Sequence, residues 1–151
     1  MLRITIPPPI IALIFGLLIW AMNLYLPLYV PTLGKLSYFG YLFILMGLAL
    51  DIVSFVNFLK NKTTVNPLKP QKASTLVISG FYRISRNPMY LGMFCILLGV
   101  ATLLGDISGL IPLPILVLTM NYLQIVPEEK VLAEIFGDEY LTYKKDVRRW
   151  I

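Results

Sequence analysis

Apolar residues gather along the chain into four long segments separated by polar stretches. The segments cover residues 10–30, 36–59, 88–104 and 107–126. The first two are long enough to cross a hydrocarbon core of about 30 Å at about 1.5 Å per helical residue. The last two are near the lower limit, and the tight turn 105–109 between them predicts a helical hairpin that either just spans or re-enters. The pattern predicts an all-α, multi-pass membrane helix bundle with about four transmembrane helices.

The composition supports a chain embedded in a membrane. Of its 151 residues, 58% are hydrophobic and 14% are charged, with a mean hydropathy of +0.77. Soluble domains are about half apolar and about a quarter charged. The first segment is too long for the apolar part of a signal peptide, follows three prolines and precedes no small-residue cleavage site. We therefore expect it to be a retained helix in an integral membrane protein.

Basic residues are distributed unevenly along the chain. They lie mainly between the second and third segments and in the C-terminal tail, whereas the loop after the first segment has only Lys35 and the hairpin turn only Asp106. By the positive-inside rule, we expect both termini and the long loop to face the cytoplasm, in the cytoplasmic membrane if the chain is prokaryotic. A nucleic-acid role for the net charge of +5 is disfavoured, because these charges lie where anionic lipid would meet them.

The reactive side chains exclude several kinds of site. The chain has no histidine and one cysteine, Cys95, within the third segment. The commonest general base and the commonest metal ligand are therefore missing, and we expect no metal site. A Ser/His or Cys/His nucleophile pair is excluded.

The loop before the third segment ends in GFYRISRNPMYLG, residues 80–92. Upstream, residues 63–74 carry two prolines and predict extended chain, and TLVISG (75–80) is too isolated for a sheet. The pair Asn87-Pro88 predicts a helix start, because Asn is a favoured N-cap and Pro at the first helical position loses no hydrogen bond. The loop should deliver tyrosines and arginines to a helix amino terminus at the membrane surface.

The C-terminal tail predicts two short amphipathic helices. Pro127, Glu128 and Glu129 suit a helix start or the continuation of the fourth segment, and apolar residues then recur at helical spacing. Gly137 interrupts the pattern before a second apolar stripe. We expect an interfacial element, with Trp150 at the headgroup level.

Several polar groups have both a structural and a functional interpretation. A carboxylate such as Asp51 inside the second segment costs about 2.5–3.5 kcal/mol, so it either bonds to neighbouring helices or contacts a ligand. Glu128 and Glu129 are either an ordinary helix start or acceptors for a cation. A helix amino terminus at Asn87 also offers N–H donors to an anion. The combination would suit a zwitterionic amino-acid moiety.

Two blocks of sequence carry a family resemblance. LVISGFYRISRNPMYLG, followed by a hydrophobic hairpin and EEKVLAEIFGDEYLTYKKDVRRW, resembles the isoprenylcysteine carboxyl methyltransferase family and its bacterial phospholipid-methyltransferase-like relatives. The resemblance covers residues 63–150. It implies one domain, 1–151, with two transmembrane helices in 1–59 and a cofactor-binding catalytic core in 60–151. It also implies an S-adenosylmethionine-dependent methyltransferase that takes a lipophilic small-molecule acceptor from the bilayer.

The resemblance also implies roles for individual residues. The cofactor-binding positions would be Ser74, Thr75, Leu76, Val77, Tyr82, Asn87, Pro88, Met89, Tyr90 and Glu128. Glu129 and Arg86 are candidate catalytic residues, and Gln124 and Asp51 are candidate substrate contacts. Asn87 stands where prenylcysteine methyltransferases usually have histidine, and Gln124 stands where they have an arginine that would pair with a substrate carboxylate.

Three alternatives remain open. The acceptor could be a carboxyl of a prenylcysteine-like compound or a phospholipid amine, and an amine must first lose a proton to Glu129, a tyrosine or water. A small transporter using Asp51 would belong to a different class, although the chain has no repeat and no second intramembrane charge. A non-catalytic membrane scaffold is the third possibility.

Overall fold

The structure, a computed structural model, describes residues 6–28, 36–61 and 74–151. Within these ranges the protein is all-helical, which confirms the predicted fold class. The helices are α1 (Pro8–Tyr25), α3 (Phe39–Lys60), α4 (Pro88–Leu104), α5 (Pro112–Met120) and α6 (Val126–Asp146), with 3₁₀ turns η2 (Gly80–Arg83) and η3 (Ser108–Leu110) and a π-helical turn η4 (Asn121–Ile125). The extended chain predicted for residues 63–74 lies outside the described residues except for Ser74.

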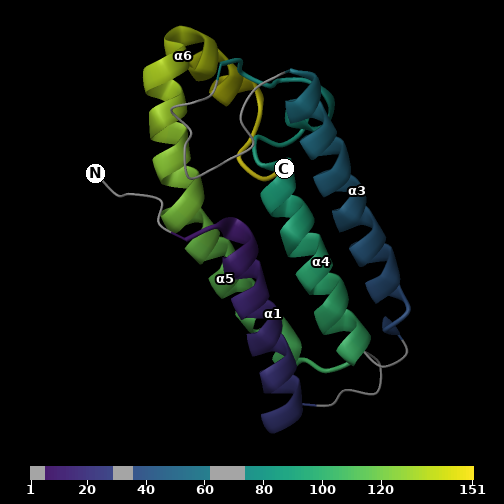
Figure 1. Ribbon diagram of the computed structural model, residues 1–151. Helices are drawn as coiled ribbons and strands as arrows, with labels where there is room; N and C mark the ends of the chain where they lie inside the picture. The colour runs from purple at the N-terminus through teal and green to yellow at the C-terminus, as the bar shows by residue number, and fades with distance from the viewer. Residues whose placement is uncertain (1–5, 29–35, 62–73) are drawn as a thin grey trace.

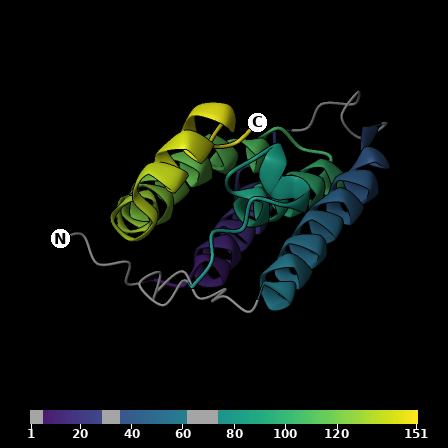
Figure 2. The ribbon, with the colours of Figure 1, turned by 90° about the horizontal axis from the view of Figure 1, so that it is seen from above.

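The long helices run side by side, with α4 in the middle of the bundle (Figure 1). α3 packs against α4 from one side, and α1 and α5 pack against it from the other (Figure 2). A core of buried apolar side chains fills the space between α1, α4 and α5; its members include Ile11, Phe15, Ile19, Leu97, Ala101, Leu113, Leu116 and Met120. α3 therefore attaches to the bundle through one face only.

Four glycines bring α3 and α4 unusually close together. Gly47 faces Gly92, and a Cβ atom added at Gly47 would lie 2.6 Å from the Gly92 carbonyl oxygen. Gly40 and Gly99 repeat the arrangement seven residues away on each helix, with the same distance of 2.6 Å. Small residues are the usual means of close helix packing in membranes. This packing also brings the Asp51 carboxylate of α3 into contact with the α4 backbone at Gly92.

Three helical stretches are long and apolar enough to cross a membrane: Pro8–Tyr25, Phe39–Lys60 and the continuous stretch Ser108–Asp146. Their outward faces expose large apolar side chains such as Leu13, Leu45 and Ile52. α4 has 17 residues, or about 25 Å at about 1.5 Å per residue. It is shorter than the others but begins at the predicted residue, Pro88.

The connection between α4 and α5 is longer than the predicted turn. α4 ends at Gly105, which has a φ of 71°, and α5 begins only at Pro112, after η3. The Asp106 carboxylate organises the connection, since one oxygen accepts hydrogen bonds from Leu28 N at 2.8 Å, Ser108 N at 2.9 Å and Ser108 Oγ at 2.8 Å. These bonds hold the pKa of Asp106 below its usual range, although burial opposes the shift. Asp106 therefore joins the end of α1 to the start of η3.

The fourth apolar segment continues directly into the tail. Helical structure runs from α5 through η4 into α6. Pro127 gives a physical reason for the π-helical turn, because it has no N–H for the carbonyl four residues earlier and its ring crowds that carbonyl. Gly137 then kinks α6, with φ 52° and ψ −126°, so the expected pair of short helices is confirmed.

Candidate active site

A carboxylate and a phenol meet where α4 and α6 begin. Tyr90 lies in the first turn of α4, and its hydroxyl donates a hydrogen bond to Glu128 Oε2 at 2.9 Å. The Tyr90 side chain is buried, and Glu128 is half-buried. Because α4 begins at Pro88, the N–H groups of Met89 and Tyr90 have no acceptor within their own helix. An acceptor for a cation and donors for an anion thus lie close together.

Tyr82 adds a second buried phenol to this region. Its ring packs edge-on against Phe58 of α3, with the centroids 5.5 Å apart, and its backbone carbonyl accepts a hydrogen bond from the Tyr143 hydroxyl at 2.7 Å. Burial raises the pKa of Tyr82 well above its usual range, and the nearby Glu128 and Asp51 carboxylates raise it further. The Tyr82 hydroxyl therefore stays protonated and can act only as a neutral donor or acceptor.

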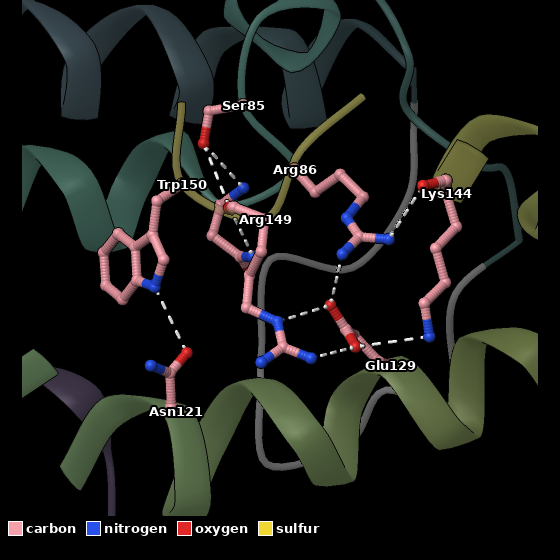
Figure 3. A network of polar contacts seen from close by, with 8 residues as sticks. Ser85, Arg86, Asn121, Glu129, Lys144, Arg149 and Trp150 are labelled. Atoms are coloured by element: carbon pink, nitrogen blue, oxygen red, sulfur yellow. Dashed lines mark hydrogen bonds and ion pairs between the residues drawn. The ribbon is translucent and has the colours of Figure 1, made fainter. Parts of the chain in front are cut away.

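Glu129 lies next in sequence to Glu128 but points into a separate cluster of cations (Figure 3). Arg149 donates hydrogen bonds to both carboxylate oxygens of Glu129, from Nε to Oε1 at 3.0 Å and from Nη2 to Oε2 at 2.8 Å. Arg86 pairs with Glu129 at 3.0 Å, and Lys144 lies 3.7 Å away. The predicted catalytic residues Glu129 and Arg86 are thus neighbours. Because both Glu129 oxygens are engaged, the cluster is suited to holding structure in place rather than to accepting a proton.

The C-terminal tail returns to the start of α4 and bonds to it (Figure 3). The Arg86 amide donates to the Arg148 carbonyl at 3.0 Å, and the Asn87 side-chain amide donates to the Arg149 carbonyl at 3.0 Å. Asn87 does occupy the N-cap position, but the predicted side-chain cap is not formed. Trp150 donates its indole N–H to Asn121 Oδ1 at 3.2 Å and packs against the core, a protein contact that we did not predict.

Asp51 and Gln124 each keep a buried oxygen without a hydrogen-bond partner among the described residues. These atoms are Asp51 Oδ1 and Gln124 Oε1. Gln124 is fully buried in η4, and its amide nitrogen donates to the Ile6 carbonyl at 2.6 Å. The Asp51 carboxylate thus faces α4 at Gly92, and its Oδ1 forms no hydrogen bond with that helix.

A pocket of about 570 Å³ opens between the loop before α4 and the second half of α6. Leu76, Ile78 and Val147 contribute apolar surface, while Arg83 and Glu139 contribute opposite charges. Tyr143 also lines this pocket, so the pocket adjoins Tyr82 through the hydrogen bond described above.

The predicted cofactor positions divide into two groups in the structure. Tyr90 and Glu128 are bonded directly, and Tyr82 lies within electrostatic reach of Glu128. Of the upstream positions, Leu76 lines the pocket and Val77 is buried, whereas Ser74 and Thr75 are exposed. No group of three or more Asp, Glu, Cys or His side chains in the described part of the chain could hold a metal ion.

Sequence reasoning missed Arg149, Tyr143 and Ser85, although the first two lie in the tail block that carries the family resemblance. The Ser85 hydroxyl donates a hydrogen bond to the Arg149 carbonyl at 3.3 Å and accepts one from the backbone N–H of Asn87 at 3.1 Å. The paired arginines before Trp150 were a possible signal, but only the folded tail distinguishes Arg149 from Arg148.

Comparison with known proteins identifies the family. The family model "Phospholipid methyltransferase" matches residues 36–139, which is most of the chain. The chain belongs to this family. Its members include membrane methyltransferases, and together with the three long apolar helices this makes the protein an integral membrane protein of the methyltransferase type.

Two curated relatives were found. An uncharacterized protein of Haemophilus influenzae is 43% identical over 63 residues, covering 42% of this chain and 100% of that protein. The protein-S-isoprenylcysteine O-methyltransferase of Schizosaccharomyces pombe is 34% identical over 79 residues, covering 52% of this chain and 34% of the yeast enzyme. The chain thus matches about a third of the yeast enzyme's length. No solved structure matches it.

Proposed function

We propose that this protein is an S-adenosylmethionine-dependent membrane methyltransferase that takes a lipophilic acceptor from the bilayer. The observation that carries the proposal is the Tyr90–Glu128 pair at the amino terminus of α4. An amino-acid moiety has an ammonium group and a carboxylate, and this corner of the bundle offers a carboxylate and N–H donors respectively. S-adenosylmethionine has such a moiety and supplies a methyl group activated by a sulfonium.

The residues of the chain fit this cofactor by their chemistry. Glu128 would accept hydrogen bonds from the ammonium group, and the N–H groups of Met89 and Tyr90 would donate to the carboxylate. Leu76 and Tyr143 line the neighbouring pocket, which has room and apolar surface for a nucleoside. Tyr82 lies between the two regions and would donate from its neutral hydroxyl.

We infer that this end of the bundle faces the cytoplasm. The described basic residues all lie at the end of α3, in the loop before α4, in α6 or in the tail: Lys60, Arg83, Arg86, Lys130, Lys144, Lys145, Arg148 and Arg149. The end of α3, the start of α4 and the C-terminus lie at the same end of the bundle (Figure 1). The opposite end has the Asp106 connection, with no basic residue between 105 and 111. This asymmetry follows the positive-inside rule.

Methyl transfer from a sulfonium is an in-line displacement, so the protein must mainly align the acceptor and exclude water. The methyl acceptor would approach from the bilayer through the apolar bundle, beside α3, because α3 packs against its neighbours on one face only. A carboxylate acceptor is already a nucleophile and needs no base. An amine acceptor must first lose a proton.

An amine is the second candidate acceptor, and one observation favours it. Arg86 and Arg149 both pair with Glu129, although Arg86 Nε has no described partner, so a substrate carboxylate would have to compete with Glu129 for them. Asp51, in contrast, presents a buried oxygen without a described partner and lies within electrostatic reach of Tyr82. A cationic amine would satisfy that oxygen, and Asp51 would then be its proton acceptor.

Calorimetry of S-adenosylmethionine binding to detergent-purified protein tests the proposal. Glu128→Gln should weaken binding by about 10–100-fold, because a hydrogen bond to a charged group contributes about 1.5–3 kcal/mol. Glu134→Gln is the matched control, since it removes an exposed carboxylate from the same helix. A folded wild type that does not bind the cofactor would rule the proposal out. If the wild type binds the cofactor, transfer of a radiolabelled methyl group to phosphatidylethanolamine vesicles or to a prenylcysteine would distinguish the amine acceptor from the carboxylate acceptor.

A further inference from the structure

The tail Arg148–Trp150 contacts the residues just before α4, the first turn of α6 and the π-helical turn η4. Its backbone carbonyls bind the Arg86 amide and the Asn87 side chain immediately before α4. Its Arg149 side chain binds the first turn of α6, and Trp150 binds the π-helical turn η4 at Asn121. Three consecutive residues, Arg148 to Trp150, therefore join segments that are 20 to 64 residues away along the chain.

Arg149 makes the most specific of these contacts. Its guanidinium forms a two-pronged bond with Glu129, at 3.0 and 2.8 Å, and its own carbonyl accepts from both Asn87 and Ser85 (Figure 3). A planar guanidinium fixes the orientation of a carboxylate as well as its distance. Glu129 is therefore held in one orientation, while the adjacent Glu128, about 100° further around the helix, bonds to Tyr90.

We propose that Arg149 is a positioning residue for cofactor binding, which acts through Glu129 to direct the Glu128 carboxylate toward the cofactor's ammonium group. This inference rests on the proposed function. Arg149 itself touches neither Glu128 nor Tyr90. It sets the rotation of the first turn of α6 and, through its carbonyl, the position of Asn87 at the start of α4.

The test compares two ligands that differ in the group Glu128 would hold. S-adenosylmethionine has the amino-acid moiety, whereas 5′-methylthioadenosine has the nucleoside and lacks that moiety. Both are measured by displacement of radiolabelled S-adenosylhomocysteine from detergent-purified protein. Arg149→Gln should weaken S-adenosylmethionine binding by about tenfold and 5′-methylthioadenosine binding by less than about twofold, because only the former uses Glu128.

Arg148→Gln is the matched control, because it removes the same charge from the neighbouring residue, whose side chain is exposed. It should leave both affinities unchanged. Arg149→Lys keeps the charge and one hydrogen bond, and should restore S-adenosylmethionine binding to within about threefold of wild type. If Arg149→Gln does not fold, the Lys variant carries the test alone, with a small loss for S-adenosylmethionine and none for 5′-methylthioadenosine.

Equal weakening of both ligands would show that Arg149 only supports the fold, and unchanged binding of both would show that it has no role; either result overturns the inference. Failure of the wild type to bind S-adenosylmethionine would instead overturn the proposed function. The two failures are therefore distinguishable in one experiment.

Discussion

Replacing Gly47 with alanine tests the close packing of α3 on α4, on which the position of Asp51 depends. The added Cβ would lie 2.6 Å from the Gly92 carbonyl oxygen, 2.7 Å from Ile96 Cγ1 and 2.9 Å from the Ile96 amide nitrogen. Two of these three atoms belong to the backbone and cannot rotate away. Since non-bonded heavy atoms prefer separations of about 3.5–4.0 Å, the two helices would have to move apart by about 1 Å.

The energetic consequence follows from two opposing contributions. Alanine in place of glycine favours a helix by up to about 1 kcal/mol, whereas overpacking typically costs about 1–3 kcal/mol. We therefore expect Gly47→Ala to lower the free energy of unfolding by about 1–2 kcal/mol. The separation of the helices should also break the contact of Asp51 with Gly92.

Gly16→Ala is the matched control, because it makes the same substitution in another apolar helix with different surroundings. Its added Cβ would lie 3.4 Å from a side-chain atom of Leu97, which is close to an ordinary contact. It should leave the unfolding free energy unchanged or raise it by up to about 1 kcal/mol. Unfolding in mixed micelles with increasing dodecyl sulfate, followed by circular dichroism, measures both variants. If Gly47→Ala proved as stable as Gly16→Ala, α3 and α4 would not be in the close contact described here.

Three further changes test other parts of the structure. Gly137→Ala should destabilise the protein by about 1–3 kcal/mol in the same unfolding assay, because its φ of 52° strains any side chain; unchanged stability would mean that α6 is not kinked there. Tyr90→Phe should lower the unfolding free energy by about 1–2 kcal/mol through loss of a donor to Glu128, and an unaltered value would argue against that bond. Asp106 has a folded-state pKa below its unfolded value, so its stabilisation is present above pH 4 and is lost as the pH falls further. Thermal unfolding between pH 6 and pH 3 should therefore depend less on pH in Asp106→Asn than in wild type, and identical profiles would contradict this.

Features that depend only on neighbouring residues could be predicted from the amino-acid sequence. Apolar length predicted the helices, Asn87-Pro88 predicted the start of α4 at the correct residue, and Gly137 predicted the break in the tail. Each of these is a local preference of backbone or hydropathy, so no knowledge of the remaining chain is needed. The π-helical turn was missed even though Pro127 is visible, because a proline in a first helical turn does not reveal whether the helix before it has ended, and here helical structure runs on from α5 through η4 into α6.

Which polar groups meet depends on how the helices and the tail pack together. Glu128 bonds to Tyr90, 38 residues away, while its neighbour Glu129 bonds to Arg149. Two adjacent glutamates look equivalent in a sequence, but successive residues point about 100° apart around a helix, so they face different partners. Which partner each one finds depends on how α4, α6 and the returning tail pack together. The role of each glutamate is therefore a property of the folded bundle.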